Sequence, residues 1–336
     1  MEGFPGVNVG SRGMTNGRTM TRRRFLGRAL GSTALTVGLG RSEIWPGRVE
    51  ASEAKRGPYI DVHTHVGRTW TGDPPLSPDD LVRWMDEHNV ARAVVLPLVS
   101  PESSSYLNLT EQALDAAGKH PTRLVPFCCI DPRTSYTMGK KGLQSMVKEY
   151  VDRGAKGFGE HKAGLPIDHP KMIDLYEVCD DLKLPVLFHM DQLRGTDIPG
   201  LPGLEKVLKT LPNAQFIGHG PGFWASISGG LGPDGLGIYP KGPVQPDGAL
   251  DRLFDRYPNL WGDLSAGSGA NALSRDLKFG KGFLERRADR LMFGTDYLKV
   301  GQEVPQFDLL ASFDLAPEIL AKIERENAAK LLGLKL

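Results

Sequence analysis

The sequence has few cysteines, almost no net charge and no long apolar run. Its 336 residues include three cysteines, Cys128, Cys129 and Cys179, and carry a formal net charge of +1. Three cysteines, two of them adjacent, do not form a disulfide framework. No apolar run reaches the roughly 18 residues that a membrane-spanning helix needs, so we expect no stable membrane insertion. A chain with 40% hydrophobic and 24% charged residues is typical of a globular protein rather than a disordered or fibrous one.

The charge is unevenly distributed along the chain. Residues 1–51 contain eight arginines, no lysine and three glutamates, a net charge of +5, which leaves −4 for residues 52–336. Proteins that bind nucleic acids present a basic face to the phosphates. The slightly acidic body of this chain therefore argues against a nucleic acid as its partner.

A basic segment precedes a short apolar one near the N-terminus. The segment 21–26, Thr-Arg-Arg-Arg-Phe-Leu, is followed by a modestly apolar stretch over 29–40. This order is typical of a secretory signal, and the paired arginines resemble the twin-arginine type. We therefore predict that residues 1–54 are a twin-arginine signal peptide and disordered leader, cleaved near Ala51 or Ala54. The export machinery would then deliver the protein to the periplasm or otherwise outside the cytoplasm. The alternative is a disordered basic tail.

Short apolar segments alternate with longer amphipathic ones from residue 57 onward. Eight such strand-then-helix units predict a (β/α)₈ TIM barrel over residues 55–336. A doubly wound sheet would carry a Gly-rich first turn, and none follows the first expected strand. The expected strands span residues 59–63, 93–97, 124–130, 155–160, 186–189, 215–219, 260–264 and 291–293. The expected helices span 77–88, 107–119, 143–153, 170–182, 202–210, 249–257, 271–287, 305–313 and, closing the chain, 317–332.

One segment breaks this alternation. Residues 221–247, after the sixth expected strand, are rich in Gly and Pro. Loops of this length are uncommon unless they are functional or disordered. We expect the insertion to cover the active face or to contact a partner, and a disordered surface insertion is the alternative.

Histidines and acids gather where the strands of the expected barrel end. In this fold the C-terminal strand ends carry the chemistry. His63 and His65 close the first strand on one face, with Cα atoms about 6.6 Å apart. Imidazole nitrogens are favoured ligands of zinc and similar divalent metals. From the residues alone, a metal-binding pair and a hydrogen-bonded structural pair are both open.

Four further residues extend this set. Glu160 ends the fourth strand, where a carboxylate can bind one ion or bridge two, or can form an ion pair with Lys162 or a nearby arginine. His189 and His219 each end an apolar strand, and the occurrence of both favours ligands over core histidines. Asp296 follows the eighth strand, beside the first in a closed barrel. It can bind an ion and accept a proton from a metal-bound water, whose pKa falls to about 7.

The order of these residues resembles that of the amidohydrolase superfamily, and within it the amidohydrolase-related family of metal-dependent hydrolases. The likeness runs from about Tyr59 to Leu332. It rests on the His-x-His pair and on the segments 186–189 (Val-Leu-Phe-His), 216–219 (Phe-Ile-Gly-His), 291–296 (Leu-Met-Phe-Gly-Thr-Asp) and 323–332.

The resemblance implies a set of roles. His63, His65, His189 and Asp296 would be metal ligands, and Asp296 would also carry the proton. His219 would bind a second metal or polarise the substrate carbonyl. Many binuclear relatives bridge their metals with a carbamylated lysine, where this chain has Glu160, so one ion or two are both open. The expected ion is zinc, with manganese as the alternative.

Three functions fit these residues. The first is hydrolysis of an amide, lactone or ester of a small, cyclic substrate. The second is non-oxidative decarboxylation, for which Arg194 would hold the substrate carboxylate. The third is a barrel that binds without catalysing, although no expected ligand is missing. Trp224, next to Phe223 directly after His219, suits contact with a cyclic or apolar substrate unless both aromatics only pack the insertion. A homo-oligomer is open.

Overall fold

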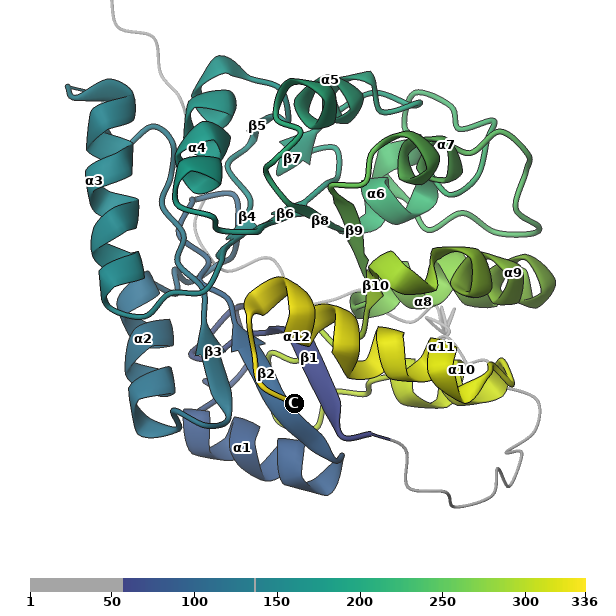
Figure 1. Cartoon of the computed structure of the whole chain (residues 1–336), viewed down its shortest axis with the longest axis horizontal. Helices are drawn as coiled ribbons and strands as arrows, with labels where there is room; N and C mark the ends of the chain where they lie inside the picture. Colours follow the sequence, from purple (N-terminus) through teal and green to yellow (C-terminus); the bar gives the residue numbers. More distant parts are fainter. Residues whose placement is uncertain (1–56, 136) are drawn as a thin grey trace, which may run out of the picture. The chain divides into compact units, whose positions relative to one another are not determined.

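Eight parallel strands form a closed ring in the computed structural model, which describes residues 57–135 and 137–336 (Figure 1). The predicted signal segment lies outside the described residues, as does the predicted boundary at residue 54. All eight expected strands are present, with ends shifted by a few residues. They are β1 (Tyr59–Thr64), β2 (Val90–Val95), β3 (Leu124–Pro126), β4 (Phe158–His161), β6 (Val186–His189), β8 (Phe216–His219), β9 (Leu260–Asp263) and β10 (Leu291–Met292).

The ring is built from two arcs that meet at two seams. One arc has the order β1-β2-β3 and the other β10-β9-β8-β6-β4, with every pair parallel. A bridge between Cys128 and Phe158 joins β3 to β4. At the second seam the amide of Val62 donates to the carbonyl of Phe293 at 3.0 Å, and Thr64 pairs with Tyr297. The first and last strands of the described chain are therefore neighbours.

Helices cover the outside of the ring, as the amphipathic segments predict (Figure 1). The first shows how the sequence starts such a helix: Ser77 Oγ accepts from the Asp80 amide at 3.1 Å, and a proline occupies the first turn, where its missing N–H costs nothing. The outer helices are α1 (Pro78–Glu87), α2 (Thr110–Lys119), α3 (Gly139–Asp152), α4 (Pro170–Asp181), α5 (Pro202–Thr210), α7 (Ala249–Arg256), α8 (Ala266–Ser274), α9 (Leu277–Arg287) and α10 (Gln306–Ser312).

The Gly/Pro-rich insertion has structure of its own. It begins with the short helix α6 (Pro221–Ala225) and contains a 3₁₀ turn, η1 (Gly235–Gly237). Leu236 within that turn is buried, which pins the middle of the segment to the barrel. Two short strands, β5 (Leu165–Pro166) and β7 (Gly195–Thr196), pair with each other outside the ring.

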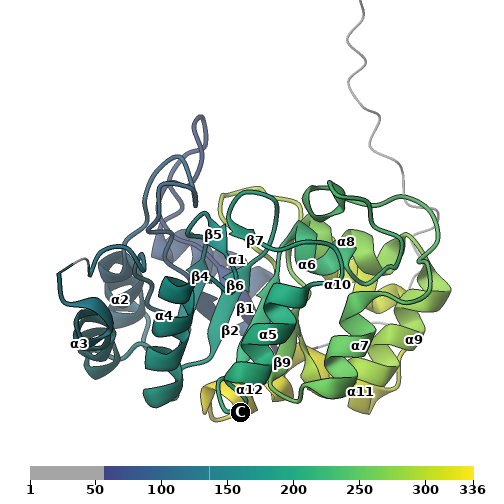
Figure 2. The same cartoon turned by 90° about the horizontal axis from the view of Figure 1, so that it is seen from above.

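The hydrophobic core has two layers. The larger lies between the strands and the surrounding helices. The smaller gathers strand residues such as Ile60, Val62 and Met292 with Ala328 and Leu332. Ala328 and Leu332 belong to α12 (Asn327–Leu332). The other elements near the C-terminal end are the 3₁₀ turn η2 (Ala288–Arg290), helix α11 (Pro317–Ala321) and the π-helical turn η3 (Lys322–Glu326). Helix α12 closes the end of the barrel opposite β5 and β7 (Figure 2). In the described part of the chain, no helix has the length and hydropathy to cross a membrane.

Candidate metal centre

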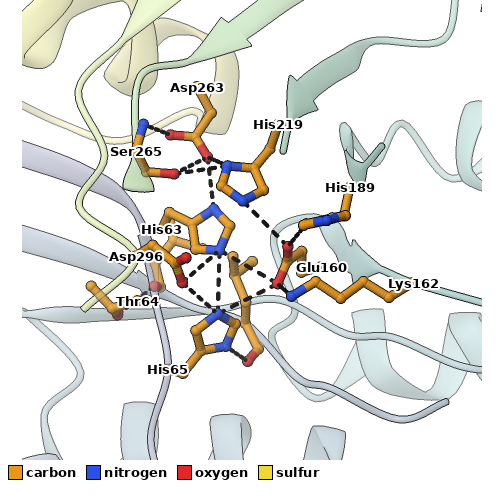
Figure 3. Close-up of polar contacts among 12 residues, drawn as sticks. His63, Thr64, His65, Glu160, Lys162, His189, His219, Asp263, Ser265 and Asp296 are labelled. Carbon is orange, nitrogen blue, oxygen red and sulfur yellow. Dashed lines mark hydrogen bonds and ion pairs between the residues drawn. The ribbon is translucent and has the colours of Figure 1, made fainter. Parts of the chain in front are cut away.

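Side chains from the ends of β1 and β4 and from the loop after β10 converge at one point (Figure 3). The closest approach is between the two Nε2 atoms of His63 and His65, 3.2 Å apart. Glu160 Oε2 lies 3.5 Å from each of these nitrogens, and Asp296 Oδ1 lies 3.5 Å from the first and 3.3 Å from the second. Donors around a tetrahedral zinc at 2.0–2.1 Å are about 3.3–3.4 Å apart. The separation of the two nitrogens, and the distances from each nitrogen to the two carboxylate oxygens, match that spacing.

The outer nitrogens of the two histidines show which tautomers are present. His65 Nδ1 donates to the carbonyl of Leu96 at 2.9 Å, and His63 Nδ1 donates to Asp263 Oδ2 at 2.7 Å. An imidazole that donates from Nδ1 presents the lone pair of Nε2, which is the usual arrangement of a metal-ligating histidine. Both lone pairs therefore face the same point, an arrangement that a cation between them stabilises.

The charges around His63 favour a cation in the same place. Its ring is completely buried, and burial opposes a positive charge. The surrounding carboxylates outweigh that penalty, with Glu160 first and Asp263 second, and raise the pKa of His63 well above its ordinary value. A site that draws a proton onto a buried imidazole in this way also attracts a divalent ion.

Asp263 ties two histidines together, and the sequence reasoning missed it. Its Oδ2 accepts from His63 Nδ1 at 2.7 Å and from the Ser265 hydroxyl at 2.7 Å, and it lies 3.2 Å from His219 Nδ1. Burial works against its ionisation, but His63 and His219 hold the pKa of Asp263 below its usual range. It is the last residue of β9, so the strand-end rule that located the other residues could have found it.

Glu160 faces two groups of partners with its two oxygens. Oε1 lies 2.9 Å from His189 Nδ1 and 3.5 Å from His219 Nε2. Oε2, which belongs to the four converging donors, also lies 2.7 Å from Lys162 Nζ. Burial raises the pKa of Glu160. The opposite effect of Lys162 and His63 is larger and holds this pKa well below its usual value. The ion pair with Lys162 and the metal-facing position predicted from the sequence are therefore both present.

His189 differs from the first two histidines because both of its nitrogens face carboxylates. Nδ1 meets Glu160, and Nε2 lies 3.0 Å from Asp191 Oδ2. The same Asp191 oxygen accepts from Arg194 Nη1 at 2.5 Å, and Arg194 Nε donates to the carbonyl of Glu102. Arg194, expected to contact substrate, is thus held at the edge of the site by Asp191.

Trp224 lies in the core rather than in the site, which corrects the expectation that it contacts substrate. Its side chain is buried and packs edge-on against Phe223 and Phe283. The indole N–H donates to the carbonyl of Asp263 at 2.8 Å. The chain turns sharply at Gly220, whose φ is +98°, and α6 then directs both aromatic side chains inward. Trp224 therefore supports the backbone of β9.

Asp296 is the donor that reaches solvent. Its side chain is 21% exposed, whereas those of His63 and Glu160 are fully buried. Its backbone amide donates to the carbonyl of His63 at 2.8 Å, which holds the two donors together across the seam of the barrel. Water or a substrate can therefore approach the four donors from the side of Asp296.

The donor atoms fall into two groups that could hold an ion. One consists of His63, His65 and Asp296, and the other of His63, Glu160 and His219. Both combine imidazole nitrogen with carboxylate oxygen, the donor types that zinc and similar divalent ions accept. The residues present fit a divalent metal. His189 belongs to neither group.

A closed (β/α)₈ barrel with histidine and carboxylate donors converging at its strand ends defines a metal-binding TIM-barrel enzyme. Residues 60–334 match the family model described as amidohydrolase, and the chain belongs to the amidohydrolase family, whose members depend on divalent metals. No curated protein matches the sequence.

Solved structures share the barrel at low sequence identity. An uncharacterised TIM-barrel protein from Bordetella bronchiseptica matches with a TM-score of 0.60 and 16% identity, over 82% of this chain and 98% of that one. A probable 2-pyrone-4,6-dicarboxylic acid hydrolase from Acinetobacter baumannii matches with a TM-score of 0.56 and 16% identity, over 83% and 100%. An amidohydrolase from Burkholderia multivorans with bound zinc matches with a TM-score of 0.53 and 14% identity, over 82% and 99%. These likenesses confirm the predicted fold.

Proposed function

We propose that this enzyme hydrolyses an amide, lactone or ester bond of a small substrate, with a divalent metal held by His63, His65, Glu160 and Asp296. The observation that carries the proposal is the convergence of the two histidine Nε2 atoms, 3.2 Å apart, with a carboxylate oxygen on either side. Zinc is the proposed ion because of the donor types and spacing, and a similar barrel contains bound zinc. That another is named for hydrolysis of a 2-pyrone, a cyclic ester, is in keeping with a lactone substrate.

Each residue has a task in this reaction. His63, His65, Glu160 and Asp296 would hold a divalent ion, which would lower the pKa of a water molecule to about 7 and so supply a nucleophile at neutral pH. Asp296, the exposed carboxylate of the set, accepts the proton and returns it to the leaving group. His219 is held at Nδ1 by Ser265 Oγ at 2.9 Å and by Asp263, and it points its Nε2 toward Glu160. With Nε2 protonated, it would donate to the substrate carbonyl and polarise it.

The proposal also includes the number of metal ions bound per chain. Glu160 Oε1, His189 Nδ1 and His219 Nε2 lie on the far side of the same carboxylate. If they held a second ion, Glu160 would bridge the two. We propose one tightly held ion at the first four donors, since His189 Nδ1 already meets Glu160 within hydrogen-bond distance. Elemental analysis of protein purified without chelator distinguishes one ion per chain from two.

The test of the mechanism is Asp296→Asn. This variant keeps a metal-binding oxygen but cannot accept a proton, so it should retain bound metal and lose turnover on a panel of lactones, aryl esters and amides. Full activity in Asp296→Asn would disprove the role of Asp296. Release of carbon dioxide from aromatic acids, without hydrolysis of the panel, would favour decarboxylation instead.

We also propose export through the twin-arginine machinery, on the strength of the N-terminal sequence pattern. The test compares the wild-type protein with Arg22→Lys, Arg23→Lys and Arg24→Lys combined in one variant. Fractionation should find the wild-type protein in the periplasm and the variant in the cytoplasm. Equal distribution of the two would contradict this route.

A further inference from the structure

The ammonium group of Lys162 is a buried cation at the candidate metal centre. Lys162 directly follows β4, and its side chain is only 8% exposed. Its Nζ lies 2.7 Å from Glu160 Oε2, and Figure 3 shows the side chain extending toward that carboxylate. Lysine is rarely buried unless its charge is paired, so the position of this group calls for an explanation.

Glu160 accounts for only part of the bonding capacity of this group. An ammonium carries three N–H donors. Among the described residues, Glu160 is the one acid within ion-pair distance of Lys162. Lys162 Nζ is not one of the fully enclosed, unpaired side-chain atoms of the described residues, so its remaining N–H groups are open to water or to a ligand.

The negative charge of Glu160 faces the metal donors as well as Lys162. The oxygen that meets Lys162 is the same Oε2 that lies 3.5 Å from both His63 and His65 Nε2. A carboxylate that shares its charge with a divalent ion compensates a neighbouring ammonium less well. When the metal is bound, Lys162 therefore becomes the undercompensated cation of the site.

The other cation at this edge is in the opposite situation. Arg194 meets Asp191 at 2.5 Å and the backbone carbonyl of Glu102 at 3.1 Å, and Asp191 has no role among the four converging donors. The positive charge of Arg194 is therefore neutralised by Asp191 whether or not a metal is bound. Of the two cations, Lys162 is the one that shares its carboxylate partner with the metal donors.

We propose that Lys162 binds an anionic group, a carboxylate, of the molecule held at the metal donors. Its ammonium would donate to that carboxylate while the reacting carbonyl faces the metal that His63 and His65 would hold. This inference rests on the proposed function, because it assumes that substrate occupies the metal centre. It narrows the substrate class to small acids.

The test is a comparison of two probes of the same shape and different charge. Benzoate and benzamide are titrated into zinc-reconstituted protein by isothermal calorimetry, and bound zinc is measured for every variant. Wild-type protein should bind benzoate at least tenfold more tightly than benzamide, because a charge-assisted hydrogen bond is about twice as strong as a neutral one. Lys162→Met should lose this preference and leave benzamide binding unchanged, and Lys162→Arg should restore most of it.

Lys156→Met is the matched control, since Lys156 precedes the same strand but is exposed; it should behave as wild type. Lys162→Gln serves as a second variant should Lys162→Met fail to fold. A wild-type protein that does not prefer benzoate would overturn the inference. A Lys162→Met variant that keeps the preference for benzoate would also overturn it. So would a variant that loses bound zinc and its affinity for both probes, because Lys162 would then act only through Glu160. This test measures binding and not turnover. Its result is therefore independent of whether the hydrolysis assays succeed.

Discussion

Two pairs of histidines end strands of the same barrel, yet their surroundings prepare them for different tasks. His63 and His65 each donate from Nδ1 to one fixed acceptor, which leaves two Nε2 lone pairs facing each other at 3.2 Å. In the second pair, His189 has a carboxylate at both nitrogens, and the His219 Nδ1 meets both Ser265 and Asp263.

The difference teaches that residue type and position on a strand do not make a histidine a ligand. The atom on the far side of the ring decides which nitrogen is free and where it points. An acceptor on one side leaves a lone pair for a metal, as in His63 and His65, whereas each nitrogen of His189 already meets a carboxylate. We therefore propose the first pair as the primary metal site, with the second pair on the other side of Glu160.

The largest expected effect comes from breaking the first pair. His63→Ala removes a lone pair from the four converging donors and takes one of three partners from the buried Oδ2 of Asp263. We expect loss of bound metal and a fall in kcat/KM larger than the 10–100-fold that loss of an outer partner typically costs. His189→Ala is the comparison variant and should retain at least one ion per chain. Equal metal loss in both variants, measured by elemental analysis, would show that the two pairs are equivalent.

Asp263→Asn tests whether the outer partner controls the ring. An amide oxygen in the place of Oδ2 can still accept from both His63 and Ser265, but it carries no negative charge, and the NH₂ group then faces the Ser265 amide that donates to Oδ1 at 3.0 Å. The Nε2 of His63 should therefore be less well held and less basic. Metal affinity should fall about 10–100-fold, measured by competition with a coloured chelator. Asp255→Asn, at an exposed aspartate that pairs with Arg287, is the control. Unchanged affinity in Asp263→Asn would refute the importance of the outer partner.

A smaller effect is expected at the second pair. Asp191→Asn weakens the contacts to His189 Nε2 and Arg194 but leaves the four converging donors in place. The affinity for the first ion should change less than tenfold, a smaller loss than an outer partner of a ligating histidine usually causes. A loss as large as that of Asp263→Asn, in the same chelator competition, would place His189 among the primary ligands.

The smallest effect concerns the support beneath the site. Trp224→Phe removes the indole hydrogen bond to the carbonyl of Asp263 and leaves a small void in the core. We expect a loss of about 1–3 kcal/mol in the free energy of unfolding, seen in urea titrations, with metal affinity little changed. Unchanged stability with a raised KM would instead return Trp224 to the role of a substrate contact.

Much of the fold was predictable because its signals are local. Apolar strands alternate with amphipathic helices, and all eight predicted strands occur in the ring. The strand-end rule also located His63, His65, Glu160, His219 and Asp296, which the structure brings together. These predictions needed only the period of the pattern and the order of the elements.

The rest depends on contacts between strands and on the direction of single side chains. Asp263 and His63 are 200 residues apart, and their hydrogen bond exists only in a ring closed in one register. The sequence likewise does not show that Asp191 holds Arg194, because that contact depends on the loop after β6. Trp224 was misplaced because the turn at Gly220 reverses its expected direction.

The seam between the first and last strands has a consequence for how the molecule assembles. Asp296 and His63 are joined by a backbone hydrogen bond across that seam, so the four donors come together only after β10 and the loop that follows it have met β1. An ion that binds them selects the closed form and stabilises it by mass action, more strongly at higher free metal concentration. Metal uptake thus reports that the ring has closed, and a chain that ends before β10 would lack both the seam and the site.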